Sequence, residues 1–166
     1  MVTLAGLDAG PAEAFEAAAA PLFEGAPRFL ARLAAARPFE SPGDMFERAR
    51  EIAHAMPEDE QVELVDAHPR LGAAPGSVSA MSFREQGYER GPLDLAAELE
   101  RLNTAYEARF GFRYCVFVAG RSRVELLPEL EAALERDRDE ELHRALDAVV
   151  DIAIDRHAKL SREAGR

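Results

Sequence analysis

Residues 139–160 read DEELHRALDAVVDIAIDRHAKL, and the apolar members of this run recur at the spacing of one helix face. The stripe that they form consists of Leu142, Leu146, Val149, Ala153 and Leu160. Separations of three, four and seven residues place side chains on one side of an α-helix, whereas a half-buried strand alternates at every second residue. The run therefore predicts a long amphipathic helix with one buried face.

Proline and glycine residues divide the sequence before residue 139 into further helical segments. Three apolar stripes precede Pro57, and a fourth helix begins there and ends near His68, because a proline disfavours helical backbone in the residue before it. The expected helices lie over residues 15–22, 29–33, 45–56, 57–68, 82–91, 92–110, 125–136 and 139–160. Residues 72–81 are expected to form a loop. Residues 115–119 are either a buried extended stretch or a helical turn, which periodicity does not distinguish.

The composition narrows the class of protein. A chain of 166 residues is long enough to bury a core, so we expect residues 1–166 to form a single, mainly helical domain. The net charge of -11 opposes binding to nucleic acid and to anionic membranes, and no apolar run is long enough to span a membrane. Cys115 is the single cysteine and has no partner for an intrachain disulfide, so we expect a cytoplasmic protein.

Cofactor motifs are absent from the sequence. There is no His-Glu-x-x-His motif, no pair of cysteines, no Walker loop, no dinucleotide fingerprint and no Gly-x-Ser-x-Gly elbow. We therefore expect neither a metal ion nor an organic cofactor.

His68 is the leading candidate for chemistry, in the segment His68-Pro69-Arg70-Leu71-Gly72. Its imidazole titrates near neutrality and can act as an acid or a base, and the carbonyl dipoles at a helix C-terminus would favour the protonated form. The alternative is a helix-terminal histidine that only caps carbonyl groups.

Ser82, Glu85 and Gln86 allow two interpretations. Ser82 and Glu85 have the spacing of a capping box, which satisfies free amides at a helix start and requires no ligand. Gln86 adds an amide next to the carboxylate of Glu85, and this pair suits a urea-like or amide-like ligand.

Arg156 falls on the apolar stripe of residues 139–160, three residues after Ala153 and four before Leu160. We therefore expect its side chain to point inward. A buried guanidinium needs an anion or carbonyl groups, so Arg156 either pairs with an internal carboxylate or faces a ligand.

Two further polar groups are explained without a ligand. Residues 136–141, Arg-Asp-Arg-Asp-Glu-Glu, are typical of a solvated turn. Asn103, Tyr106 and Phe110 share a helix face, which indicates a core stripe with one polar member.

Three blocks of the sequence, taken in order, resemble one enzyme family. The blocks are Ala67-His68-Pro69-Arg70-Leu71-Gly72, Ser82-x-x-Glu85-Gln86 and Leu102-Asn103-x-x-Tyr106-x-x-x-Phe110-Gly111-Phe112. Their order and spacing, followed by an inward arginine in the last helix, resemble the 2-oxo-4-hydroxy-4-carboxy-5-ureidoimidazoline (OHCU) decarboxylases of urate breakdown.

The resemblance implies an all-α fold of about eight to ten helices, often dimeric. It implies decarboxylation of OHCU to (S)-allantoin without a metal or organic cofactor. The catalytic candidates that it implies are His68, Glu85 and Arg156. The substrate-binding candidates are Pro69, Ser82, Gln86 and the ligand-facing backbone of Cys115, Val116, Phe117, Val118 and Ala119.

The chemistry of decarboxylation suits these residue types. Loss of carbon dioxide leaves an electron-rich centre, which must be delocalised into the ring and protonated on one face. A protonated His68 could supply that proton, while Arg156 and the amides of residues 115–119 stabilise charge on ring oxygens. Glu85 and Gln86 could orient the ureido arm by hydrogen bonds.

The sequence departs from the usual family pattern at two places. Many members read Phe-Gly-Phe-Pro-Phe where this chain has Phe110-Gly111-Phe112-Arg113-Tyr114, and the loop between His68 and Ser82 is short. Arg113 could therefore select a different or additional anionic group. Two alternatives to the OHCU decarboxylase remain: a related helical enzyme for another ureido or carboxylate compound, and a helical interaction module without catalysis.

Overall fold

The structure is a computed structural model that describes residues 4–72 and 93–166. Its helices are α1 (Leu4–Ala9), α2 (Ala12–Phe23), α3 (Pro27–Ala35), α4 (Pro42–Ala55), α5 (Glu58–Asp66), α7 (Leu93–Phe110), α8 (Arg123–Ala133) and α9 (Arg138–Ala164). Neither of the two described ranges contains a strand, so the all-α class is confirmed. None of the helices in these ranges is long and apolar enough to cross a bilayer.

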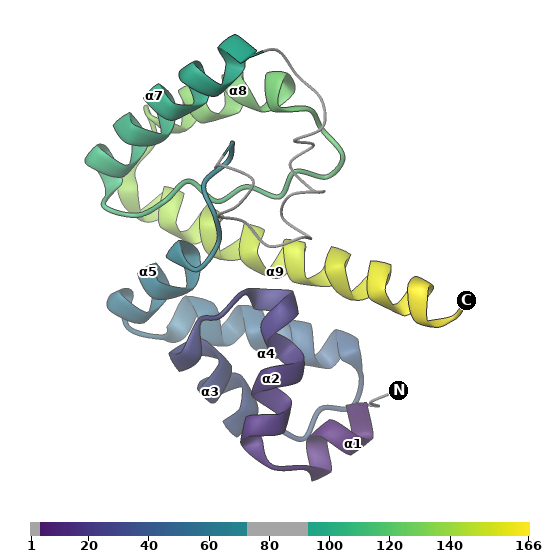
Figure 1. The fold of residues 1–166 in the computed structure, drawn as a ribbon. Helices are drawn as coiled ribbons and strands as arrows, with labels where there is room; N and C mark the ends of the chain where they lie inside the picture. The colour runs from purple at the N-terminus through teal and green to yellow at the C-terminus, as the bar shows by residue number, and fades with distance from the viewer. Residues whose placement is uncertain (1–3, 73–92) are drawn as a thin grey trace.

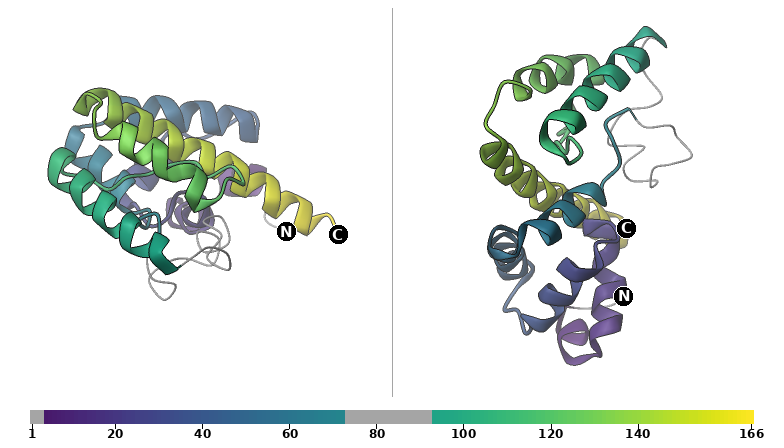
Figure 2. Two further views of the ribbon diagram at one scale, coloured as in Figure 1. Left: turned by 90° about the horizontal axis from the view of Figure 1, so that it is seen from above. Right: turned by 90° about the vertical axis from the view of Figure 1, so that its left-hand side faces the viewer.

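Helix α9 is the central element of the fold. It packs against α2, α4 and α5, and α7 packs against α8. Figure 1 shows α9 crossing the middle of the molecule, with α1 to α4 below it and α7 and α8 above it. The same three tiers are visible from the side in Figure 2. The two groups of helices are therefore joined by one long helix and by the chain that leaves α5.

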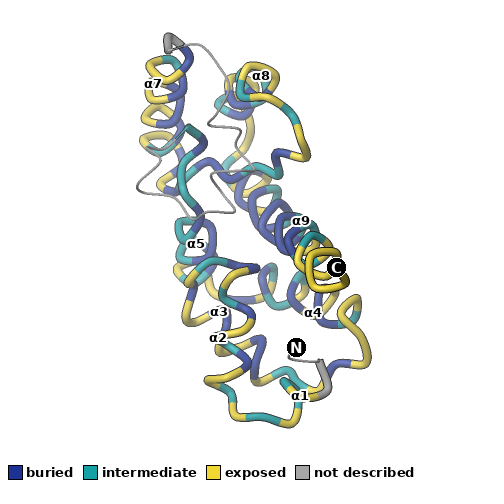
Figure 3. Tube along the Cα trace, turned by 45° about the vertical axis from the view of Figure 1, so that its right-hand side comes forward, coloured by how far each residue is buried: buried dark blue, intermediate teal, exposed yellow. Residues whose placement is uncertain are grey.

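The sequence of α9 explains both its start and its buried face. The side chain of Asp137 accepts hydrogen bonds from the amides of Asp139 and Glu140, and acidic residues fill the first turn, where the helix dipole favours negative charge. Leu146 and Val149 on the predicted stripe are fully buried. Leu160, which we expected on the same face, is 40% exposed. The C-terminal end of α9 extends past the other helices in Figure 1 and is coloured as exposed in Figure 3.

Aromatic side chains fill the core between α2, α3 and α4. The ring of Phe23 lies 4.9 Å from that of Phe29 and 6.5 Å from that of Phe46, centroid to centroid. All three side chains are buried. Such tilted and edge-on arrangements are the favoured geometries of aromatic pairs. This core fixes the end of α2 against α9, where one part of the candidate site lies.

The structure differs from the sequence-based expectation at the N-terminal end. Three helices were expected before Pro57, and the described residues contain four, because α1 precedes them. Helix α1 has no apolar stripe of helical length; instead, Arg37 Nη1 donates hydrogen bonds to the carbonyls of Leu7 and Gly10. A tertiary contact holds this short helix, and periodicity does not report such contacts.

The region after α7 is also settled by the structure. Residues 113–118 have no regular secondary structure, so the extended alternative for residues 115–119 is correct. Ala119 and Gly120 have φ values of 52° and 76°, and they turn the chain towards α8. Ser122 and Glu125 form a capping box there, which the sequence contains and we did not use. The expected helix over residues 82–91 and the loop over 73–81 lie outside the described residues.

Candidate active site

His68 lies in the turn that follows α5 and is 3% exposed. Its ring Nδ1 is 3.1 Å from the carbonyl oxygen of Leu64, and its backbone amide donates to the carbonyl of Val65 at 3.1 Å. A carbonyl oxygen only accepts hydrogen bonds, so Nδ1 carries the proton and Nε2 has a free lone pair. Nε2 is buried and has no hydrogen-bond partner among residues 4–72 and 93–166. The geometry therefore presents a basic nitrogen with nothing from the described protein bound to it.

The surroundings of His68 keep its ring neutral. Burial lowers the pKa of His68 to about 4, and the positive charge of Arg156 acts in the same direction, against smaller opposing effects from Glu24 and the Leu64 carbonyl. This result corrects the expectation of a protonated histidine. The carbonyl dipoles at the end of α5 do favour the charged form, but the loss of hydration outweighs them.

Arg156 points inward, as its place on the stripe of α9 predicted, and is 1% exposed. Its Nη1 donates to the carbonyl oxygens of Pro21 at 3.0 Å and Leu22 at 3.4 Å, and its Nη2 donates to Oε1 of Glu24 at 3.0 Å. Of the two alternatives, pairing with an internal carboxylate is therefore observed. The pairing brings the end of α2 and the C-terminal half of α9 together beside His68.

Glu24 lies with Arg156 and His68, although no sequence pattern predicted it as a site residue. It follows the last residue of α2 and has a φ of 58°, an uncommon value for a residue with a side chain. No local sequence motif identifies Glu24, because its partner, Arg156, lies 132 residues further along the chain. Only the three-dimensional structure relates these two residues.

The segment from Cys115 to Ala119 is held by its carbonyl groups. Arg144 Nη1 donates to the carbonyl of Cys115 at 2.9 Å, and Arg121 donates through Nη2 to that of Phe117 at 2.7 Å and through Nε to that of Val118 at 3.0 Å. Within the part of the chain that the structure describes, the amides of residues 116–119 donate no hydrogen bond. The carbonyl oxygens of Cys115, Phe117 and Val118 are thus occupied, whereas the amides of residues 116–119 bond to no group in the described residues.

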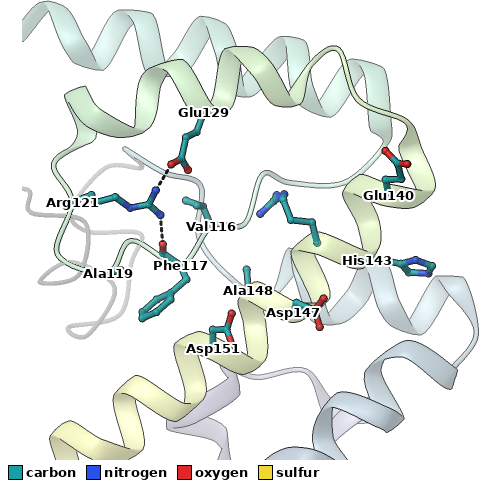
Figure 4. Close-up of a pocket in the computed structure, with 11 residues that line it drawn as sticks. Val116, Phe117, Ala119, Arg121, Glu129, Glu140, His143, Asp147, Ala148 and Asp151 are labelled. Carbon is teal, nitrogen blue, oxygen red and sulfur yellow. Dashed lines mark hydrogen bonds and ion pairs between the residues drawn. The ribbon is translucent and has the colours of Figure 1, made fainter.

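Two cavities flank this segment. One, of about 360 Å³, is lined by residues 116–120 together with Ile152, Asp155 and Lys159, on the turns of α9 that surround Arg156. The other, of about 670 Å³, is lined on one side by Arg121 and Glu129 and on the other by acidic residues of α9. Figure 4 shows Arg121 between Glu129 and the carbonyl of Phe117 in this larger cavity. Both cavities lie beside the backbone that we expected to face a ligand.

The remaining predicted site residues divide into two groups. Pro69 follows His68 directly and is partly exposed in non-helical backbone. Ser82, Glu85 and Gln86 lie outside the described residues. The two interpretations of these three residues, a helix cap and a ligand site, therefore stay predictions.

Arg113, which could select an anionic group according to the sequence, makes hydrogen bonds within the protein. Its backbone amide donates to Oδ1 of Asp66 at 2.9 Å. Its Nη1 donates to the carbonyl oxygens of Asp66 at 2.8 Å and His68 at 3.4 Å. The guanidinium therefore binds the turn that carries His68.

Glu141 also corrects an expectation, because residues 136–141 were interpreted as a solvated turn. Glu141 is fully buried. Its carboxylate accepts hydrogen bonds from the Tyr106 hydroxyl at 2.9 Å and from Arg144 Nε at 2.8 Å, and it pairs with Arg136 at 3.3 Å. Arg144 in turn holds the Cys115 carbonyl. The first turn of α9 thus supports the segment from Cys115 to Ala119.

Asn103 behaves as the polar member of a core stripe. Its Nδ2 donates to the carbonyl of Leu71 at 2.8 Å, and Tyr106 and Phe110 on the same face are buried. Over residues 4–72 and 93–166, no three His, Cys, Asp or Glu side chains form a group that could hold a metal ion.

Fold and site together define a class: an all-α protein in which a buried histidine lies beside a buried arginine, with a row of backbone amides that bond to no group in residues 4–72 and 93–166. Residues 8–158 match the model of the OHCU decarboxylase family, and the chain belongs to that family. It is 33% identical over 147 residues to the uric acid degradation bifunctional protein PucL of Bacillus subtilis, which is 87% of this chain and 30% of that protein. The chain therefore spans less than a third of this relative's length.

Other relatives match over more of their own length. The chain is 25% identical over 143 residues to the 2-oxo-4-hydroxy-4-carboxy-5-ureidoimidazoline decarboxylase of Haloferax volcanii, which is 85% of each chain. A crystal structure of OHCU decarboxylase in the presence of (S)-allantoin superposes with a TM-score of 0.72 at 23% identity, covering 91% of this chain and 98% of the other. At that identity the superposition supports the fold.

Proposed function

We propose that this chain catalyses the decarboxylation of OHCU to (S)-allantoin in urate degradation, without a metal or organic cofactor. The observation that carries the proposal is the buried Nε2 of His68, whose lone pair is fixed by the bond from Nδ1 to Leu64. Membership of the OHCU decarboxylase family supports the choice of substrate. The relatives of Haloferax volcanii and mouse that carry the decarboxylase name support it as well.

A neutral His68 suits the first step of this reaction. One ring carbon of OHCU bears both a hydroxyl and a carboxylate group. Nε2 accepts the hydroxyl proton while the bond to the carboxylate breaks, carbon dioxide leaves, and the electron pair passes into the neighbouring C=N bond. The ring nitrogen that receives this pair takes a proton from solvent.

The second step returns the proton to carbon. The imidazolium formed at His68 donates its Nε2 proton to the carbon that bears the ureido group, on one face, and this sets the handedness of the product. The burial and the Arg156 charge that lower the pKa of His68 to about 4 make this imidazolium a ready donor. The amides of residues 116–119 would stabilise negative charge on ring oxygens.

The roles of the remaining candidates stay proposals. Arg156 would stabilise developing charge and hold Glu24 beside His68. Pro69 would restrict the backbone conformation of His68. Ser82, Glu85 and Gln86 would bind the ureido arm through hydrogen bonds. Their proposed role rests on the resemblance of the Ser-x-x-Glu-Gln block.

The proposal is tested by the handedness of the product. OHCU can be generated enzymatically from urate and decays by itself to racemic allantoin. With the protein present, we expect allantoin to form faster than by this decay and to give the circular dichroism signal of a single enantiomer. Racemic allantoin at the spontaneous rate would refute the proposed function.

We also propose a homodimer in the cytoplasm, with residues 1–166 forming one domain in each subunit. Support for the dimer comes from the family resemblance, and support for the compartment from the single cysteine, Cys115. Size-exclusion chromatography with light scattering should give twice the chain mass of 18.2 kDa. A mass of one chain would contradict the dimer.

A further inference from the structure

Arg113 occupies the joint between two parts of the proposed site. It comes directly before the extended segment that includes Cys115 to Ala119, and it contacts the turn after α5. Its backbone amide bonds to the Asp66 side chain, and its Nη1 bonds to the carbonyl groups of Asp66 and His68. Three hydrogen bonds thus connect residues that lie 45 to 47 positions apart in the sequence.

These bonds complete the fixation of His68. The amide of His68 bonds to Val65, its ring Nδ1 bonds to Leu64, and its carbonyl accepts from Arg113. The first two bonds come from within the last turns of α5, and the third comes from Arg113, which lies after α7. Nε2 is the one polar atom of His68 that binds no group in the described residues.

We infer that Arg113 is a positioning residue, which sets the place of the His68 imidazole relative to the backbone amides of residues 116–119. This inference rests on the proposed function, because it assigns the position of a group that the proposed reaction uses. The reaction needs Nε2 and the amides to meet one small ring at the same time. Errors of about 1 Å in such an arrangement cost up to about 100-fold in rate.

A purely structural role for Arg113 makes a different prediction. The last carbonyl groups of α5 need donors, and a basic side chain near a helix C-terminus supplies them and complements the dipole. If Arg113 did only this, its loss would lower the stability of the fold and leave the turnover of the remaining folded enzyme unchanged. Turnover and stability must therefore be measured separately.

The test replaces Arg113 by Met, which keeps an unbranched stem and removes every side-chain donor. For R113M we expect kcat to fall by about 10-fold to 100-fold with KM changed by less than about 3-fold, because the binding groups stay in place. R113K restores a cationic donor and should recover part of the lost kcat. The control is R138M, since Arg138 donates to the Phe110 carbonyl at 2.9 Å and pairs with Glu58, without contact to His68. R138M should keep the kcat of the unsubstituted chain.

A second readout does not depend on activity. The pKa of His68, followed by NMR of its imidazole, should rise in R113M from about 4 towards the ordinary histidine value of about 6.5, because a loosened turn admits water to the ring. R138M should leave this titration unchanged. An unchanged kcat and an unchanged His68 titration in R113M would overturn the inference.

Two outcomes separate this inference from the proposed function. An unsubstituted chain that makes only racemic allantoin overturns the proposed function, and the NMR titration then still decides whether Arg113 positions His68. Should R113M fail to fold, R113K takes its place, because a lysine ammonium does not reproduce the geometry with which the guanidinium reaches both carbonyl groups. A folded R113K variant should show a lower kcat and a higher His68 pKa than the unsubstituted chain, and the absence of both changes would overturn the inference.

Discussion

At the scale of single residues, the environment of His68 decides what its side chain can do. The end of a helix favours a charged imidazole by about 1 kcal/mol, whereas burial of a charged group costs several times that amount. The ring of His68 is therefore neutral because the folded chain buries it. The same burial turns Nε2 into an acceptor for a proton of the ligand.

The first prediction concerns stability as a function of pH. The pKa of His68 is about 4 in the folded chain and about 6.5 in the unfolded chain, so the unfolded chain binds more protons between these values. Stability from this residue is complete above pH 6.5 and is lost as the pH falls towards 4, by up to about 3 kcal/mol. For H68Q, the free energy of unfolding measured with urea should not show this decrease between pH 6.5 and pH 4. Parallel stability curves for both proteins from pH 4 to 7 would contradict the assignment.

The second prediction concerns the buried pair of Arg156 and Glu24. R156M leaves the Glu24 carboxylate and the Pro21 and Leu22 carbonyls without this donor, and it should lower the free energy of unfolding by about 3 kcal/mol. It should also raise the pKa of His68, because a positive charge that lowers this pKa is removed. Urea unfolding and NMR measure the two effects.

The matched control is Arg28, an arginine with two carboxylate partners on the surface. Its side chain is 45% exposed in the pairs with Asp59 and Glu63, and R28M should lower the free energy of unfolding far less than R156M does. Equal losses in R156M and R28M would show that burial does not strengthen the Arg156 pair.

At the scale of elements, α9 supports both the core and the site. Its first turn carries Glu141, which links Tyr106 of α7 to Arg144, and Arg144 holds the Cys115 carbonyl. Burial alone raises the pKa of Glu141, but the hydrogen bond and charge of Arg144 outweigh it, so the pKa is lowered overall. The carboxylate is therefore ionised and paired at neutral pH.

The third prediction replaces this buried carboxylate. E141Q leaves Arg144 and Arg136 without their shared anion, and it should reduce the free energy of unfolding by about 3 kcal/mol. Because the pKa is lowered in the folded chain, the loss should shrink as the pH falls through that pKa. D139N, an exposed acid in the same turn, should change stability by about 0.5 kcal/mol or less. An E141Q variant as stable as D139N would contradict this role.

Helix positions could be predicted from the sequence wherever an apolar stripe or a helix-ending proline lies within the segment itself. The stripe of α9, the stop at Pro57 and the inward direction of Arg156 all follow from spacing along one element. The burial of Glu141 could not be predicted in this way. The sequence around a carboxylate in an acidic turn is the same whether the side chain is exposed to solvent or paired with two arginines. Helix α1 was not predicted for the same reason, because a hydrogen bond from the distant Arg37 holds it.

At the scale of the whole molecule, the site forms where α9 meets the ends of other elements. His68 comes from the end of α5, Glu24 from the end of α2, and Arg156 from α9 itself. Both α2 and α5 pack against α9, which passes between the two groups of helices in Figures 1 and 2. Sequence spacing alone could not bring such distant residues together. The resemblance to a family indicated His68 and Arg156, and it gave no sign of Glu24 or of the contact from Arg113.

The central claim is that Nε2 of His68 moves the proton that makes one enantiomer of allantoin. The most direct measurement follows optical activity as OHCU is consumed, with the unsubstituted chain and with H68N compared at equal concentration. We expect the unsubstituted chain to give a single-enantiomer signal well ahead of spontaneous decay, and H68N to be slower by about 100-fold or more with a largely racemic product. An H68N variant that retains the full rate and the full optical signal would contradict the claim.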